Sequence, residues 1–158
     1  MWSIFCAHVA AGETYPFTTA TSRETGHAYW LGPEVASFVA TAGGRLLGMY
    51  RLVPNQIGRG HHVANASYMV SPSAQGAGVG RRLGQHSLDE ARRLGYLAMQ
   101  FNYVVSTNTA AIRLWKKLGF SIVGTLPKAY RHKRLGYVDA YVMYQLLQDP
   151  DHWPTVDA

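Results

Sequence analysis

A glycine-rich turn between a strand-like run and a helix-like run is the segment of this sequence best suited to chemistry. The strand-like run ends at Val70, and the segment QGAGVGRR, which starts at Gln75, leads into apolar residues at helical spacing. Glycines let backbone N–H groups approach a ligand closely, and a helix N-terminus adds unsatisfied N–H donors and partial positive charge. The turn therefore predicts a cradle for a pyrophosphate, unless its glycines serve only tight packing.

Two common phosphate-binding motifs do not match this turn. A P-loop ends in Gly-Lys-Ser/Thr, whereas Gly80 is followed by Arg81. A dinucleotide-binding fingerprint needs a third glycine where Arg81 stands. It also needs an acidic residue at the end of the next strand, which here reads YLAMQFN from Tyr96. Both motifs are therefore excluded.

Patterns along the chain predict a mixed α/β (α+β) domain over residues 1–148, followed by a loose tail over residues 149–158. Helices are expected at Trp2–Ala10, Thr21–Leu31, Gly78–Leu94 and Asn108–Leu118, the second from a capping box of Thr21 and Glu24. Strands are expected at Val35–Ala42, Arg45–Val53, Val63–Val70, Tyr96–Val105, Ser121–Thr125 and Tyr137–Leu147. Gly43 and Gly44 suit a hairpin turn between the first two strands, and a basic loop, Lys128–Gly136, precedes the last strand. This order indicates a sheet with a central strand–helix–strand–helix (β-α-β-α) unit.

The composition excludes several classes of protein. At 158 residues, with 47% hydrophobic residues, the chain is long enough to bury a core without disulfides. Its one cysteine, Cys6, allows neither a disulfide framework nor a multi-cysteine metal site, and we expect it to pack on the apolar face of the first helix. No metal site, signal peptide or membrane span is recognisable, which favours a cytoplasmic protein without a membrane partner.

The net charge of +6 favours an anionic partner. Five basic residues lie on the two helices that follow the turn: Arg81, Arg82, Arg113, Lys116 and Lys117. Because they are concentrated beside the predicted cradle, a polyphosphate explains the charge better than a nucleic acid does. The sequence also lacks an aromatic RNA-binding motif and a recognition-helix pattern, so no nucleic-acid partner is expected.

Two segments resemble the signatures of the GNAT (Gcn5-related) N-acetyltransferase superfamily. The first, QGAGVG from Gln75, follows a strand, and the second, NTAAIRLWKKLGF, starts at Asn108 on the next helix. The resemblance covers residues 33–147 and implies a GNAT-like, mostly antiparallel sheet whose fourth and fifth strands splay apart. Within the superfamily, the stretch FNYVVSTNTAAIRLWKKLGF is similar to a branch containing fungal acetyltransferases that act on proline analogues.

The resemblance also implies a function. An acetyl group would pass from acetyl-CoA to a primary or secondary amine of a small molecule, such as an amino acid or an analogue, by direct attack. Acetylation of a protein N-terminus or lysine, and an acyl-CoA-binding sensor with weak catalysis, are the alternatives. Short predicted connections and the absence of an acidic peptide groove favour the small-molecule acceptor.

In the family pattern, the backbone of the turn holds the pyrophosphate of acetyl-CoA, and the preceding strand pairs with the pantetheine arm. The residues at these positions are Met69, Val70, Gln75, Gly76, Ala77, Gly78, Val79, Gly80 and Arg81, with Asn108 and Trp115 from the second signature. The Val70 N–H is implied to polarise the thioester carbonyl. Trp115 stands where the family usually has a tyrosine that serves as general acid. Because an indole N–H cannot deliver a proton to a thiolate, we expect Trp115 to pack against the pantetheine arm.

Another residue would then serve as the general acid, and Tyr103 and Tyr130 are the candidates, with solvent as the alternative. Glu13, in a loop expected to lie over the substrate groove, is a candidate general base. His61 and His62 have a suitable pKa range, although a histidine pair in a glycine-rich loop is usually ordinary polar surface.

Two asparagines inside predicted strands are further candidates. Alternation places Asn65, Ser67 and Met69 on one face of their strand, and Gln100, Asn102 and Val104 on one face of the next. An amide within a half-apolar strand is costly unless it is hydrogen-bonded. Asn102 is therefore predicted to anchor a substrate carboxylate or to hold a water for amine deprotonation, or else to satisfy a strand edge or a neighbouring loop.

The start of the chain departs from the family pattern. Members normally open with a strand at the sheet edge, whereas Trp2–Ala10 has helical spacing, so the usual first strand is predicted to be absent. Val35–Ala42 would then have one unpaired edge. A partner chain (as in a homodimer), a neighbouring loop or an upstream segment is expected to cover it.

Overall fold

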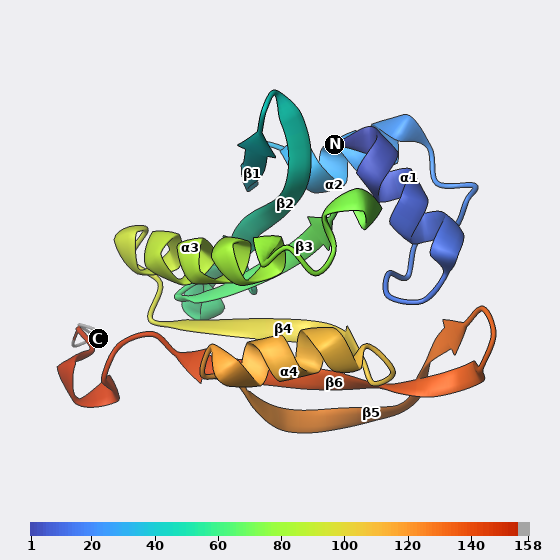
Figure 1. Cartoon of the computed structure of the whole chain (residues 1–158). Coiled ribbons are helices and arrows are strands. Elements are labelled where there is room, and N and C mark those ends of the chain that lie inside the picture. The colour runs from blue at the N-terminus through green and yellow to red at the C-terminus, as the bar shows by residue number, and fades with distance from the viewer. Residues whose placement is uncertain (155–158) are drawn as a thin grey trace.

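Six strands form one sheet in the order β1-β2-β3-β4-β6-β5. The structure is a computed structural model that describes residues 1–154 (Figure 1). The strands are β1 (Ala36–Ala42), β2 (Arg45–Pro54), β3 (Val63–Val70), β4 (Ala98–Val105), β5 (Ser121–His132) and β6 (Gly136–Leu146). The helices are α1 (Trp2–Ala11), α2 (Arg23–Leu31), α3 (Val79–Arg93) and α4 (Thr109–Lys117), with short 3-10 turns η1 (Gly58–Gly60), η2 (Pro72–Ala74) and η3 (Pro150–His152). Within residues 1–154 only the β3–β4 pair is parallel, so the mixed, mostly antiparallel sheet predicted from the sequence is confirmed.

The two faces of the sheet bury separate cores. Along β2, Tyr50 and Leu52 belong to the core covered by α3 and α4, whereas Met49 belongs to the core covered by α1 and α2. The same alternation continues on β3, where Met69 joins the second core. Figure 1 shows α3 lying along β2 and β3, and α4 lying along β4, β6 and β5. From Met49 onward on β2, and along β3, the odd-numbered residues thus face α1 and α2, whereas Leu47 packs against the α3/α4 core.

The helix ends follow local capping rules, with one correction. Helix α1 ends at Gly12, whose φ of 62° lets its N–H reach the carbonyls of His8 and Val9. Helix α2 is capped by Ser22, whose side chain accepts a hydrogen bond from the Thr25 N–H at 3.1 Å. The predicted capping box at Thr21 is therefore wrong, because the Thr21 hydroxyl instead accepts from the Thr18 N–H at 3.2 Å in the preceding turn.

Cys6 corrects a second expectation. It lies on α1 but is exposed, whereas Ile4, Phe5 and Val9 form the buried side of the helix. The packing role predicted for Cys6 is therefore wrong, because the buried face is centred one residue earlier than the spacing suggested.

Two strand irregularities were not anticipated. Strand β5 continues seven residues beyond the predicted end at Thr125 to His132, so most of the predicted basic loop is a hairpin with β6. Within it, Lys128 has a φ of 53° and its N–H donates to the Asp139 side chain at 2.9 Å, which holds a bulge.

In β4, the register with β6 shifts between Phe101 and Val104, so Val104 is buried in the α3/α4 core. Val104 therefore does not share a face with Asn102, contrary to simple alternation.

The start of the chain is helical, as predicted. Helix α1 begins at Trp2, and within residues 1–154 β1 pairs with β2 alone, so β1 is an edge strand.

Part of the tail predicted to be loose has structure. It contains η3, and the rings of Trp153 and His62 make an edge contact with centroids 5.7 Å apart. The remainder of that tail, residues 155–158, lies outside the described residues. No helix among the described residues is long and apolar enough to span a membrane.

Candidate active site

A crevice opens where β3 and β4 stop pairing. Their parallel register comprises Val63↔Ala98, Ala64↔Met99 and Asn65↔Gln100, after which the two strands separate. The crevice has a volume of about 290 Å³ and is walled by β3, β4, α4 and the loop of residues 14–16. These correspond to the fourth and fifth strands of the family pattern, because no strand precedes β1 among residues 1–154. The predicted splay is thus present.

Backbone hydrogen bonds show which groups of β3 face this crevice. The Ser71 N–H donates to the Leu47 carbonyl at 2.8 Å, and the Val63 carbonyl accepts from Asn55, so odd-numbered residues of β3 turn their backbone toward β2. The His62 carbonyl instead accepts from Leu97, at the start of β4, so even-numbered residues turn toward β4. The backbone N–H and C=O groups of Tyr68 and Val70 therefore point into the gap between β3 and β4.

This alternation separates Met69 from Val70. The side chain of Met69 is buried in the α1/α2 core, and its backbone faces β2. The pairing with pantetheine that we expected of Met69 is therefore better suited to Tyr68. Sequence reasoning missed Tyr68 because the residue that faces the gap depends on the tertiary pairing of β3 with β2.

Two side chains already contact the gap-facing carbonyls of β3. The Tyr15 hydroxyl donates to the Tyr68 carbonyl at 2.6 Å, and His8 Nε2 lies 2.9 Å from the Val70 carbonyl. Because a carbonyl oxygen can only accept, His8 carries its proton on Nε2. Burial, reinforced by the nearby Tyr29, raises the pKa of Tyr15 well above its usual value, so this phenol stays protonated at neutral pH. Tyr15 was not predicted from the sequence, although its neighbours in the loop of residues 12–16 were expected over the groove.

The glycine-rich turn has the shape of an anion cradle. Gly76 and Gly78 have φ values of 78° and 76°, and a Cβ added at either would meet nothing within 4 Å. Gly78 caps α3 without a side-chain hydrogen bond, and the first turn of α3 contains no acidic residue. The first N–H groups of a helix lack intrahelical partners, so those of Val79, Gly80 and Arg81 are available to a ligand. The residues present thus fit the pyrophosphate of a coenzyme.

The remaining turn residues differ in detail. Gln75 is exposed at the end of η2, and the Ala77 N–H is partly engaged, since it donates to the Ala74 carbonyl at 3.4 Å. A Cβ at Gly80 would lie 3.5 Å from Leu114 Cδ2, which is ordinary contact with α4. Gly80 therefore has room for a Cβ beside α4, while Gly76 and Gly78 leave the cradle open.

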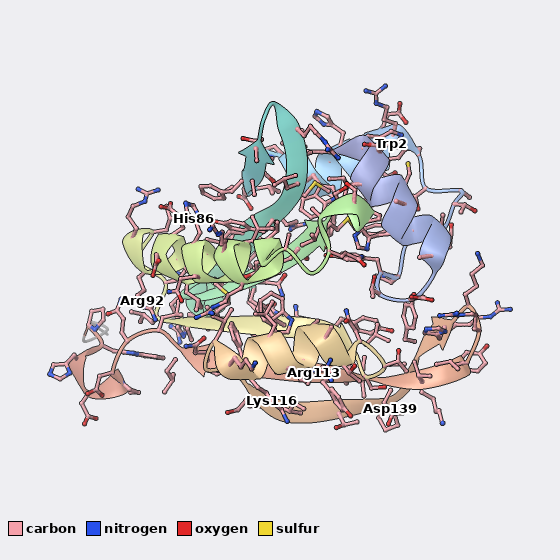
Figure 2. All side chains as sticks on the ribbon, in the orientation of Figure 1. Trp2, His86, Arg92, Arg113, Lys116 and Asp139 are labelled. Carbon is pink, nitrogen blue, oxygen red and sulfur yellow. The ribbon has the colours of Figure 1, made fainter. Side chains whose placement is uncertain are left out.

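The basic residues beside the cradle are exposed. Arg81 and Arg82 on α3, and Arg113, Lys116 and Lys117 on α4, point to solvent and form no ion pair within residues 1–154. Figure 2 labels Arg113 and Lys116 on α4. These charges add a positive field around the turn without being neutralised by the protein itself.

Asn108 and Trp115 occupy opposite ends of α4. Asn108 is the N-cap, with its side chain accepting from the Ala111 N–H at 3.2 Å, and it lines the crevice. Trp115 is buried, and its ring packs against Tyr68 and Phe101, with centroid separations of 4.6 and 4.8 Å. The structure thus gives Trp115 a packing position at the floor of the crevice.

The polar wall of the crevice is hydrogen-bonded within the protein. Asn65 Nδ2 donates to the Gln100 carbonyl at 2.9 Å, which bridges β3 and β4 at the point where they separate. Gln100 Nε2 donates to Asn102 Oδ1, and Asn102 Nδ2 donates to Asn55 Oδ1, both at 2.7 Å. Asn102 therefore satisfies a neighbouring loop, as one alternative predicted, while it also lines the crevice.

Of the predicted acid–base residues, only Tyr103 lines the crevice. Its hydroxyl donates to the Ala129 carbonyl on β5, and burial raises its pKa. Tyr130 is buried behind the loop and donates to the Tyr15 carbonyl at 3.2 Å. Burial, with smaller contributions from Tyr103 and Glu13, also raises the pKa of Tyr130.

The other predicted bases lie elsewhere. Glu13 forms an ion pair with Arg134 and borders a neighbouring hollow of about 430 Å³, not the crevice. His61 contacts the Gly58 carbonyl at 2.7 Å in the β2–β3 connection, and His62 packs against Trp153. The structure does not bring any of these three residues into the crevice.

The sequence model of the acetyltransferase (GNAT) family matches residues 2–120. The chain therefore belongs to the GNAT family of acetyltransferases. It is an acyltransferase, and acetyl-CoA, the acyl donor of this family, is its co-substrate.

Individual relatives agree with this assignment. The N-acetyltransferase aca1 of Schizosaccharomyces pombe is 32% identical over an alignment that covers 94% of this chain and 77% of aca1. An L-methionine sulfoximine/L-methionine sulfone acetyltransferase of Salmonella typhimurium is 42% identical over 62 residues, 39% of this chain and 36% of that protein. A solved GCN5-related N-acetyltransferase from Kribbella flavida is 43% identical, with a TM-score of 0.87 over 92% of this chain and 89% of that chain.

Proposed function

We propose that this protein transfers the acetyl group of acetyl-CoA to an amine of a small molecule, an amino acid or an analogue. The observation that carries the proposal is the crevice at the β3–β4 separation, which is lined by amides and hydroxyls. Strand β3 leads from this crevice to the glycine-rich turn and to the N-terminus of α3, which has no side-chain cap. The crevice volume of about 290 Å³ suits a compact acceptor. The acceptor named for the Salmonella typhimurium relative, a modified amino acid, supports the same class.

In this proposal, the β3 backbone and the glycine-rich turn bind acetyl-CoA and polarise its thioester. The N–H groups of residues 75–81 hold the pyrophosphate, and Asn108 contacts the pantetheine region. The Val70 N–H, with the Tyr68 N–H next to it on the same side of β3, polarises the thioester carbonyl and stabilises the developing oxyanion. Trp115 forms the apolar floor against which the arm packs.

Proton transfer is assigned to the polar wall. Free amines are mostly protonated near pH 7, yet no carboxylate or histidine lines the crevice within residues 1–154. We propose that Asn65 and Asn102 hold a water that carries the amine proton to solvent. Tyr15 protonates the departing thiolate. Its phenol lies on the gap-facing edge of β3, and its O–H turns from the Tyr68 carbonyl to the sulfur as the C–S bond breaks. Tyr103, whose hydroxyl is turned to β5, is the second candidate for that role.

We further propose a cytoplasmic setting and a homodimer. The free, exposed Cys6 and the use of acetyl-CoA are compatible with a reducing compartment. A second copy paired along β1 would cover the edge that β1 leaves open.

The test is a turnover screen with acetyl-CoA, read by free thiol release, over amino acids, proline analogues, polyamines and short peptides. We expect acetylation of one or more amino acids or analogues, with the product confirmed by mass spectrometry. Preference for peptide N-termini or lysines would replace the small-molecule proposal. Tight acetyl-CoA binding without any turnover would point to the sensor.

A further inference from the structure

His132 combines burial with an unpaired hydrogen-bond donor. It ends β5 and is only 6% exposed. Its Nδ1 accepts hydrogen bonds from the backbone N–H groups of Arg134 and Leu135, at 3.1 and 3.3 Å. Because both bonds need an unprotonated Nδ1, the ring proton is on Nε2. Within residues 1–154 this Nε2–H has no acceptor, and it is not among the unpaired side-chain atoms that are sealed from solvent, so it is open to a ligand.

His132 lines the hollow of about 430 Å³ that lies beside the crevice. The walls of this hollow come from the loop after α1, the N-terminal turn of α4 and the β5–β6 hairpin, which lie at the same end of the molecule (Figure 1). Thr14 and Asn108 line both the hollow and the crevice. The two spaces therefore adjoin along these two residues, and a small acceptor in the crevice can extend into the hollow.

The other groups around the hollow are mainly donors. Arg134 pairs with Glu13 through Nη2, which leaves further N–H groups of its guanidinium free. Glu13 is the one acidic residue that lines the hollow within residues 1–154, and its charge is balanced by this ion pair. Ala110 lies in the first turn of α4, where backbone N–H groups lack intrahelical partners and no acidic side chain is present. The hollow is thus suited to an anion.

We propose that His132 and Arg134 bind the carboxylate of the amino-acid acceptor in this hollow, while its amine lies in the crevice beside Thr14 and Asn108. The inference rests on the proposed function and deepens it, because it names the residues that recognise the acceptor. A carboxylate accepts from both donors and carries the charge that a guanidinium attracts. A carboxamide is neutral, and its own N–H groups oppose the Nε2–H of His132. Free amino acids are therefore favoured over their amides.

The test compares matched acceptors in the wild type, Arg134→Gln and His132→Asn. The probes are L-proline with L-prolinamide and β-alanine with β-alaninamide, whose carboxyl carbon is one atom farther from the amine, each assayed for kcat and KM at saturating acetyl-CoA. We expect the wild type to prefer the acid in at least one pair. Each variant should lower kcat/KM for that acid about 10- to 100-fold, mainly through KM, and leave its amide within about 2-fold. Because each acid is compared with its own amide, differences in amine basicity cancel between variants.

Two features of the variants guard against indirect effects. In His132→Asn the amide oxygen can replace Nδ1 as the acceptor for the hairpin N–H groups, so the turn is kept while the Nε2–H is lost. Arg131→Gln is the matched control for Arg134→Gln, since Arg131 is an exposed cation of the same hairpin that does not line the hollow. We expect Arg131→Gln to leave acids and amides within about 2-fold of the wild type. The thermal shift with CoA should be unchanged in all three variants.

The outcomes separate this inference from the proposed function. Equal losses for acid and amide in His132→Asn or Arg134→Gln would assign these residues a structural role and overturn the inference. A loss in Arg131→Gln as large as that in Arg134→Gln would replace direct binding by a general effect of positive charge. Wild-type enzyme that acetylates the amides as well as the acids would also overturn the inference, yet leave the proposed function intact. Absence of turnover with every amine would refute the proposed function and, with it, this inference.

Discussion

The hydroxyl of Tyr15 donates a hydrogen bond of 2.6 Å to the carbonyl of Tyr68, a residue 53 positions later in the chain. On the other side, the Tyr15 carbonyl accepts a hydrogen bond of 3.2 Å from the hydroxyl of Tyr130 on β5. One loop residue thus joins the two halves of the sheet across the place where β3 and β4 separate. The Tyr15 phenol consequently reaches the gap-facing backbone that the α3 and α4 signatures alone do not identify.

The first prediction follows from this position. Tyr15→Phe removes the proposed proton donor to the thiolate, and we expect kcat to fall about 100-fold with the KM for acetyl-CoA changed little. The measurement is steady-state thiol release with the best acceptor from the screen.

Tyr103→Phe is the matched control. It also removes one phenol from the crevice wall, but one that is hydrogen-bonded to Ala129 on β5 and not to the gap-facing backbone of β3. We expect its kcat to stay within about 5-fold of the wild type, since that hydroxyl contributes only an ordinary hydrogen bond. The reverse order of the two variants would assign the acid role to Tyr103.

Three tyrosines with raised pKa values predict how stability depends on pH. Burial raises the pKa values of Tyr15, Tyr50 and Tyr68 in the folded protein. Unfolded tyrosine titrates near pH 10, so stability from this source is complete below pH 10 and is lost as the pH rises above it. Each phenol that stays protonated while its unfolded counterpart ionises lowers the free energy of unfolding by about 1.4 kcal/mol per pH unit.

Tyr50→Phe isolates one of these contributions. Tyr50 bonds His86 on α3 at 2.7 Å, outside the crevice (Figure 2 labels His86). We expect urea unfolding to show that the stability lost between pH 9 and 11 is smaller in Tyr50→Phe by about 1.4 kcal/mol, nearly all of it above pH 10. Parallel curves for the wild type and the variant would show that Tyr50 ionises as readily in the folded protein.

Local sequence patterns predict the elements of this site but not all of its residues. The glycine-rich turn, helices α3 and α4, and the helical start at Trp2 follow from short-range spacing and capping, so each is readable without tertiary information. The direction of a backbone N–H on β3 depends on its register with β2, which distinguishes Tyr68 from Met69. The face of Val104 depends on a shift in the β4–β6 register. Local hydrophobic periodicity predicts neither the β2–β3 register nor the shift in the β4–β6 register.

The glycine-rich turn gives a prediction for coenzyme binding. Gly78→Asn adds a side chain where the cradle is open, and asparagine tolerates the φ of 76° better than other bulky residues. We expect the fold to remain and the stabilisation by CoA to disappear. For a ligand at 100 times its Kd that stabilisation is about 2.7 kcal/mol, or roughly 5–10 °C in Tm.

Gly95→Asn is its control. Gly95 follows α3 at its other end, has a φ of 84° and also has nothing within 4 Å of an added Cβ. The backbone strain of the two variants is therefore similar, about 1 kcal/mol each. The CoA-dependent shift in Tm should survive in Gly95→Asn. If it also survives in Gly78→Asn, the cradle lies elsewhere.

Trp115 yields a prediction about chemistry and packing. We expect Trp115→Phe to keep substantial turnover, because the indole donates no proton, and to lose about 1–3 kcal/mol of stability through the void left beside Tyr68 and Phe101. Trp115→Tyr should equal or exceed the wild-type rate. Rate assays and urea unfolding measure the two effects separately. A collapse of turnover in Trp115→Phe, with CoA affinity intact, would mean that the indole takes part in the reaction.

The two edges of the sheet are unequally protected. Strand β5 carries Lys128 and Arg131 and a bulge, features that discourage pairing with another sheet. Strand β1 has the sequence ASFVATA, without a charge, and pairs with β2 alone within residues 1–154. Val39 is exposed at its centre. An uncharged, apolar edge of this kind favours pairing with a second copy.

The last prediction is that the wild type self-associates through β1 and that Val39→Lys weakens this association at least 10-fold. A lysine at the centre of the edge must lose hydration when another strand approaches, whereas in the monomer it stays in solvent at little cost. Val123→Lys, at a valine on β5 that is also more than half exposed, is the matched control and should leave association unchanged. Sedimentation equilibrium over a range of concentrations measures the dissociation constant of each variant. A wild type that remains monomeric throughout, or equal weakening by both lysines, would show that β1 is not the association surface.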